Sequence, residues 1–109
     1  MHTYEITKDD KSIHIMVERA IVPENTQQYI NDLNDIVKDI NTHDYDLYVD
    51  GTNYIITPLD MQDTLRKHMQ HIKELGFKKV TINIGDKKVL KIQVCRIANE
   101  AGLDNIEII

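Results

Sequence analysis

Two histidines stand three residues apart in a segment with helical periodicity, a spacing that could hold a metal ion. His68 and His71 would lie near one another on the helix. His14 or His43 could supply a third imidazole. The pair lacks the glutamate of a His-Glu-x-x-His zinc site, and its neighbours are residue types common on helix surfaces. We therefore interpret both histidines as structural or solvated side chains and expect no metal site.

Cys95 is the single cysteine, so these residues can form neither an intramolecular disulfide nor a cysteine-based zinc site. It stands beside Val94, which belongs to the apolar stripe of a predicted helix. We expect Cys95 to be buried as a small hydrophobic side chain and assign it no nucleophilic role.

Two glycine-containing turns, residues 50–53 and 84–88, each follow a predicted strand. Neither matches a Walker loop or a dinucleotide-binding fingerprint. Both would lie at the carboxyl ends of parallel strands, where α/β sheets usually bind ligands. Asp50 and Asp86 would be the polar contacts in such a crevice. A small-ligand-binding protein or enzyme built around them is the alternative function, and neither carboxylate is assigned an acid or base role.

The spacing of hydrophobic residues alternates along the chain between every second residue, as in strands, and about every 3.6 residues, as in helices. The predicted order is β-β-α-β-α-β-α-β, which implies a mixed, mostly parallel sheet flanked by helices. The strands are expected at 4–7, 13–17, 45–49, 79–84 and 106–109, and the helices from Pro23 to 40, from Pro58 to 75 and from about 87 to 101.

The second helix carries clear signals at both ends. Thr57 is a suitable N-cap, Pro58 a suitable first helical residue, and Asp60 takes the third position of a capping box. Gly76 stands where a left-handed C-terminal cap is expected.

Five segments spread over nearly the whole chain resemble the STAS domain, the fold named for sulfate transporters and anti-sigma factor antagonists. The first two resemble the family's second strand and the entry to its first helix, the third its Asp-ended strand before the regulatory loop, and the last two its closing elements. These segments are 13–18 (IHIMVE), 20–25 (AIVPEN), 46–50 (DLYVD), 78–84 (KKVTINI) and 101–106 (AGLDNI).

The resemblance implies a regulatory module that binds a protein partner and is not an enzyme. In that family a Ser or Thr just before the second helix is commonly phosphorylated, and Thr57 is the nearest match here. The sequence departs from the pattern, because Ile56 stands where an Asp usually precedes the hydroxyl and Pro58 follows it. A purely capping role for Thr57 is the competing interpretation. Thr52 is the second candidate phosphorylation site.

The expected partner-binding surface consists of the loop 51–57 and the exposed side of the second helix. Its residues, besides Thr57, are Gly51, Asn53, Gln62, Asp63, Arg66 and Lys67. A phosphate in this loop would add nearly two negative charges at a helix N-terminus and repel a charge-sensitive partner.

The composition sets limits on the class of protein. The 109 residues suffice for one domain, 1–109, and 41% hydrophobic with 28% charged residues is typical of a globular protein. A formal net charge of -5 and the lack of a dense basic stretch argue against nucleic acid and anionic membranes as partners.

The chain shows neither a signal peptide nor a long apolar segment, so we expect a cytoplasmic protein without a cofactor. A homo-oligomer is an alternative, with residues 54–56 (YII) as the apolar patch.

Overall fold

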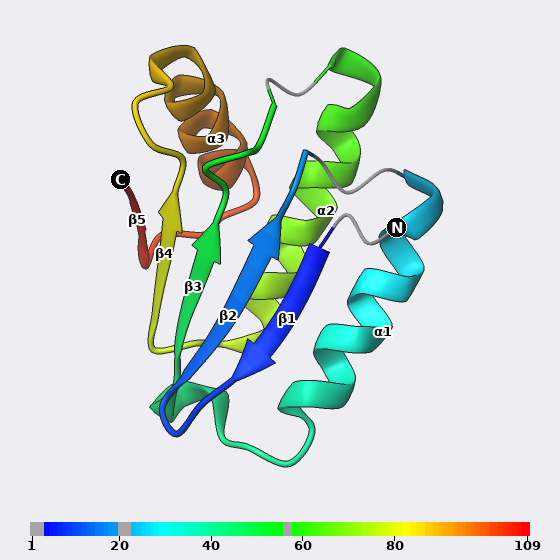
Figure 1. The fold of residues 1–109 in the computed structure, drawn as a ribbon, viewed down its shortest axis with the longest axis vertical. Coiled ribbons are helices and arrows are strands. Elements are labelled where there is room, and N and C mark those ends of the chain that lie inside the picture. Colours follow the sequence, from blue (N-terminus) through cyan, green and yellow to red (C-terminus); the bar gives the residue numbers. More distant parts are fainter. Residues whose placement is uncertain (1–3, 20–22, 56–57) are drawn as a thin grey trace.

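The computed structural model describes residues 4–19, 23–55 and 58–109. In these ranges the chain forms one five-stranded sheet in the order β1-β2-β3-β4-β5 and three α-helices (Figure 1). β1 pairs antiparallel with β2, and the other neighbours are parallel. The predicted α/β class and order of elements are therefore confirmed. The elements are β1 (Tyr4–Lys8), β2 (Ser12–Val17), α1 (Thr26–Val37), β3 (Asp46–Asp50), α2 (Leu59–Leu75), β4 (Lys79–Asn83), α3 (Lys88–Glu100) and β5 (Ile106–Ile108), with short 3-10 turns at Pro23–Asn25 and Thr42–Asp44.

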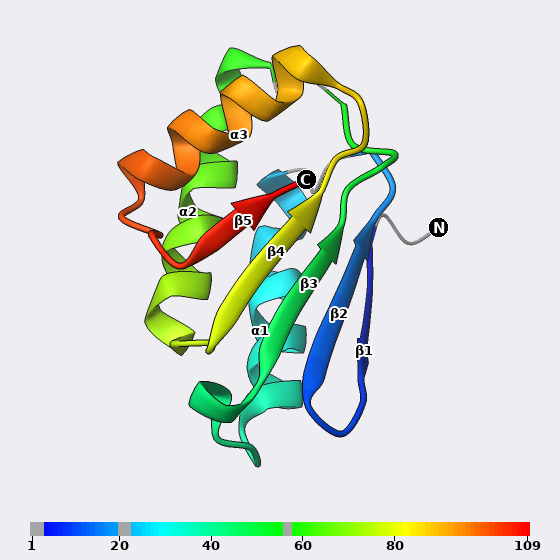
Figure 2. The same cartoon turned by 90° about the vertical axis from the view of Figure 1, so that its left-hand side faces the viewer.

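All three helices cover the same face of the sheet (Figure 2). From β2 to β5 each connection moves the chain one strand further in the same direction, and right-handed crossovers then place every helix on one side. In β2, Ile13, Ile15 and Val17 are buried beneath the helices. The expected flanking helices thus form a single layer, and the specific strand order of a STAS domain is not established by this arrangement.

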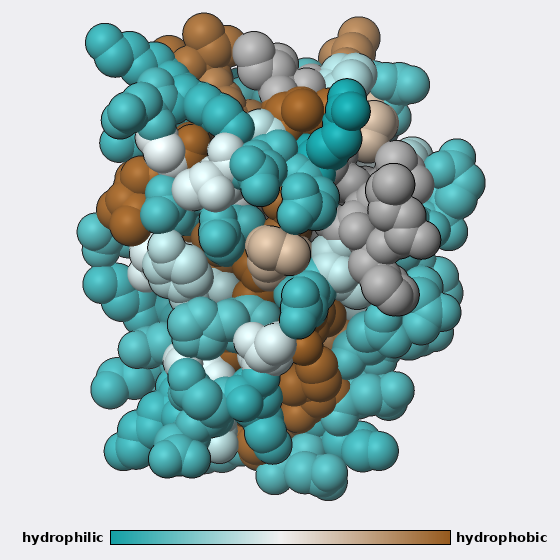
Figure 3. Space-filling view, in the orientation of Figure 1, coloured by the Kyte–Doolittle hydropathy of each residue, from teal (hydrophilic) through white to brown (hydrophobic). Residues whose placement is uncertain are grey.

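The opposite face of the sheet is uncovered by any described helix. His14, Tyr48, Thr81 and Glu107 lie in register across β2 to β5 on this open face. The space-filling view shows this face as mostly hydrophilic, with narrow apolar strips (Figure 3). A polar outer face is expected for a sheet that packs on one side only, because side chains alternate between the two faces.

The apolar stripes predicted for the helices form the core. Leu33 of α1, Met69 of α2 and Leu90 of α3 are each buried at the contact with the sheet. The prediction for Cys95 was wrong, because its side chain is exposed. It follows the buried Val94 by one residue, which turns it about 100° around the helix and off the packed stripe.

The ends of α2 differ slightly from the prediction. The helix begins at Leu59, and Pro58 takes the N-cap position with an extended ψ of 154°. The predicted start was therefore one residue too early, and the capping assignment of Thr57 lies outside the described residues. At the other end Gly76 adopts the predicted left-handed conformation, with φ 73°.

We expect Gly76→Ala to lower the free energy of unfolding more than Gly85→Ala. Both glycines have positive φ, which costs an L-residue about 1–2 kcal/mol. A Cβ at Gly76 would also lie 2.9 Å from Cε1 of His43, whereas nothing lies within 4 Å of one at Gly85. Urea unfolding of both variants measures the difference. If His43→Ala does not recover part of the loss in the Gly76→Ala background, the contact with His43 is not its cause.

Candidate binding site at the carboxyl ends of the strands

The loop that follows β3 begins with a turn built on Asp50. Its Oδ1 accepts hydrogen bonds from Thr52 Oγ1 at 2.7 Å and Thr52 N at 3.1 Å, and these bonds lower the pKa of the Asp50 carboxyl. Gly51 N donates to the Asn83 carbonyl oxygen at 2.7 Å. A Cβ at Gly51 would lie 3.3 Å from that oxygen, so glycine permits the close approach of the loop to β4.

The far end of the same loop is bonded to residues just after β2 and just before α3. Lys87 Nζ donates hydrogen bonds to the carbonyl oxygens of Thr52 and Tyr54, the latter at 2.9 Å. Ile55 N donates to the Arg19 carbonyl oxygen at 2.9 Å. The sequence analysis missed Lys87, although a lysine in a turn after a parallel strand lies at the same edge as the preceding loop. These bonds give residues 51–55 a defined conformation.

Asp50 and Asp86, predicted as the polar contacts of one crevice, lie at the end of β3 and in the turn after β4. Asp50 lines a shallow hollow on the open face with His14 and Tyr48. Asp86 is exposed. A ligand site between the two carboxylates stays a prediction.

The outer polar surface of α2 joins it to α3. Arg66 forms ion pairs with Asp63 and, at 2.7 Å, with Glu100. Arg96 pairs with Glu100 at 3.2 Å and donates to Gln62 Oε1 at 2.9 Å. The bonds to these carboxylates raise the pKa of Arg66, and those from Arg66 lower that of Glu100. Gln62 and Arg66, predicted as partner contacts, thus bridge the two helices, whereas Asp63 pairs only within α2 and is 85% exposed.

Beside the loop after β3, two apolar side chains are exposed. Leu59, the first residue of α2, is 83% exposed, and Val89 near the start of α3 is 62% exposed. Asn53 and Lys67, from the predicted surface, are also exposed. Leu59 and Val89 lie at the same end of the molecule because α2 and α3 both start at the carboxyl end of a strand. Sequence reasoning did not single out either residue, because exposure at a helix start depends on how the helix lies against the sheet.

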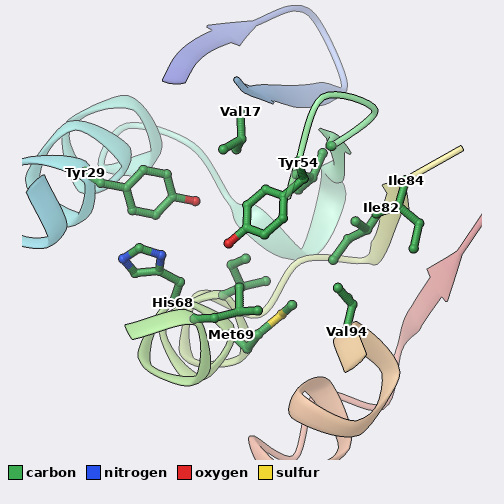
Figure 4. Close-up of a pocket in the computed structure, with 12 residues that line it drawn as sticks. Val17, Tyr29, Tyr54, His68, Met69, Ile82, Ile84 and Val94 are labelled. Carbon is green, nitrogen blue, oxygen red and sulfur yellow. The ribbon is translucent and has the colours of Figure 1, made fainter. Parts of the chain in front are cut away.

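A small cavity of about 50 Å³ lies below the loop, between the sheet and helices α1 and α2 (Figure 4). Its walls are mostly apolar, and Tyr29, Tyr54 and His68 supply the polar groups. A cavity that binds benzene measures about 150 Å³, and ligand pockets usually span about 300–1,000 Å³. The cavity therefore has room for about one or two water molecules and not for a nucleotide.

His68 is part of the core, which is the structural one of the two roles considered for it, and not of the helix surface. Its side chain is 5% exposed, its ring centroid lies 4.7 Å from that of Tyr29, and its Nε2 is buried without a hydrogen-bond partner. Burial, with a smaller contribution from His71, lowers the pKa of His68 to about 4. His71 Nε2 lies 2.8 Å from Asn34 Oδ1. The two histidines thus have separate structural surroundings.

No three His, Cys, Asp or Glu side chains in the described ranges are placed to hold a metal ion. No helix among the described residues combines the length and apolar character needed to cross a bilayer.

The fold and the site define an α/β domain with one layer of helices, a loop fixed by backbone contacts and exposed apolar residues around it. No family model matches the chain, and no curated protein matches it.

We expect Lys87→Met to loosen the loop without unfolding the domain. The substitution removes the ammonium that binds two loop carbonyls while keeping the aliphatic part of the side chain. Hydrogen exchange at the amides of Tyr54 and Ile55 should become about tenfold faster. This factor corresponds to the loss of a hydrogen bond that stabilises the closed loop by about 1.4 kcal/mol. Lys88→Met, one residue further on, is the control, and equal acceleration in both variants would contradict the proposed tie.

We expect the protein to lose stability as the pH falls from 6.5 towards 4. His68 has a folded-state pKa of about 4 against an ordinary 6.5, so between these values the unfolded chain binds the proton more readily. The full stabilisation is about 3 kcal/mol, is present above pH 6.5 and is lost as the pH falls through about 4. Urea unfolding across this range measures it.

His68→Met should flatten this pH dependence, because methionine still fills the space beside the cavity with an unbranched side chain but does not titrate. His71→Gln is the control on the same helix and should retain most of the slope. An unchanged slope in His68→Met would show that another group is responsible.

Proposed function

We propose that this chain is a regulatory protein-binding module of STAS type, whose partner docks at the carboxyl ends of β3 and β4. The observation that supports this most is the exposure of Leu59 and Val89 on either side of a loop held in one conformation. Exposed apolar side chains that surround a preformed loop are suited to the desolvated centre of a protein interface.

The surface differs from the one expected from sequence. Arg66 and Gln62 serve the α2–α3 contact, so they would contribute to binding indirectly by fixing the position of α2. The groups available for direct contact include Leu59, Val89, Asn53 and, on α2, Asp63 and Lys67. An Arg66→Glu variant would disturb the helix contact together with binding, which makes it a poor test.

The enclosed cavity is too small for a usual ligand, and the larger hollow of about 640 Å³ beside the loop, lined by Asn53, Ile55 and Val89 among others, is open to solvent. About 50 Å³ is well below the volume of usual ligand sites. A protein partner needs no such cavity, because it is recognised by a surface with apolar anchors and a polar rim.

Phosphorylation would control the docking in this proposal. Thr57 stands two residues before Leu59, the first residue of α2, and lies outside the described residues. A phosphate there would add nearly two negative charges beside the apolar Leu59, at a cost in desolvation for any partner that covers this surface. Thr52 is the second candidate, and its hydroxyl already donates to Asp50.

The test is affinity capture from native lysate with wild-type protein, Leu59→Asp and Thr57→Glu, followed by measured affinities for the captured protein. We expect Leu59→Asp to weaken binding about 30-fold or more, as truncation of an interface anchor does at about 2 kcal/mol. Thr57→Glu should weaken it similarly.

Gln70→Asp is the matched control, because it adds the same charge to an exposed position of α2 about three turns away. Equal binding by Leu59→Asp and the wild type would refute the docking surface. If only Leu59→Asp loses binding, the proposed docking surface is supported and the regulation of docking by phosphorylation of Thr57 is rejected.

A further inference from the structure

β5 forms an open edge of the sheet with half of its backbone groups directed away from β4. Val80 N donates to the Asn105 carbonyl oxygen at 3.1 Å. Ile109 N donates to the Ile82 carbonyl oxygen, and the Ile109 carbonyl accepts from Ile84 N, just after β4, both at 2.9 Å. Backbone groups alternate in direction along a strand, so those of Ile106 and Ile108 point outward. No strand of the described structure pairs with that side.

Apolar surface accompanies this edge. A groove between α3 and β5 is lined by Cys95, Ala98, Leu103, Ile106 and Ile108 among others. On either side of it, Ile92 is 71% and Ile109 45% exposed. Figure 2 shows α3 and β5 side by side and antiparallel along this edge. An unpaired strand edge beside apolar surface is a site for pairing with another chain.

The charges along this edge would be complementary to those of a second copy related by a two-fold axis. Lys88 and Lys91 lie at the amino-terminal end of α3, and Asp104 follows its carboxyl-terminal end. When two such helices lie antiparallel, the basic end of each meets the acidic end of the other. Cys95 lies near the middle of α3, so the cysteines of the two copies would lie near the axis.

This arrangement would bring Glu107 of each copy close to Glu107 of the other, and a lysine of the same chain compensates each carboxylate. In an antiparallel pairing that uses the outward groups of Ile106 and Ile108, Glu107 would face its own copy on the open side of the sheet. Like charges directly opposite one another are unfavourable. Lys79 Nζ lies 3.0 Å from Glu107 Oε2 and provides a countercharge for each carboxylate.

We infer that two copies of this chain form a two-fold dimer in which β5 pairs antiparallel with β5 of the second copy and α3 packs against its counterpart. The sheets of the two copies then continue into one another, and both helix layers lie on the same side. The carboxyl-end surface around Leu59 stays outside this interface, so the dimer is independent of the proposed docking function.

Sedimentation equilibrium tests this inference. The wild type should sediment at twice the 12.7 kDa of the chain. Ile108→Pro should shift it to a monomer, because it removes an outward N–H that makes no bond to β4. Ile108→Val keeps that N–H and should remain a dimer. Circular dichroism of both variants checks that the fold is retained.

Charge reversal examines the helix contact separately. Asp104→Lys should weaken the dimer about tenfold, and adding Lys88→Glu and Lys91→Glu should restore it. A short bismaleimide should link Cys95 of the two copies rapidly, whereas a Cys95→Ser, Gln70→Cys variant should remain unlinked. A monomeric wild type, or a dimer that Ile108→Pro leaves intact, would overturn the inference.

Discussion

The right-handed crossover between parallel strands is the constraint on which the rest of this structure depends. From β2 to β5 the chain always steps to the next strand in the same direction, so every helix lies on the same face. One face of the sheet therefore packs and the other meets water. The same stepping brings the loops after β3 and β4 to one end of the molecule, where Lys87 can bind the carbonyls of the preceding loop.

Much of this arrangement could be predicted from local pattern. Strand alternation and the helical stripes depend on the residue itself and its near neighbours, and Leu90, Val94 and Ile97 are all buried as their spacing requires. The left-handed Gly76 is another local feature, because a helix end needs only a residue that tolerates positive φ. Cys95 shows the limit of such reasoning, since one position along a helix changes the direction of a side chain by about 100°.

The candidate site was harder to predict because it depends on contacts between distant elements. His68 is polar by residue type, yet Tyr29, from another helix, provides an aromatic neighbour that makes its burial feasible. Arg66 was predicted as a partner contact on the exposed side of the second helix, but its guanidinium donates to Glu100, 34 residues later in the chain. The exposure of Leu59 follows from where α2 begins relative to the sheet, which no local pattern encodes.

The uncovered face of the sheet has a further consequence. His14, Tyr48 and Thr81 form a row across neighbouring strands, and their side chains contribute little to the packed layer beneath the helices. Substitutions on this row can change charge, shape and hydrogen bonding while the residues that alternate with them keep the fold stable. The residues that stabilise the fold and the residues that determine the chemistry of this face are therefore different ones. New recognition properties can be acquired on the open face by point substitution, without changes in the core.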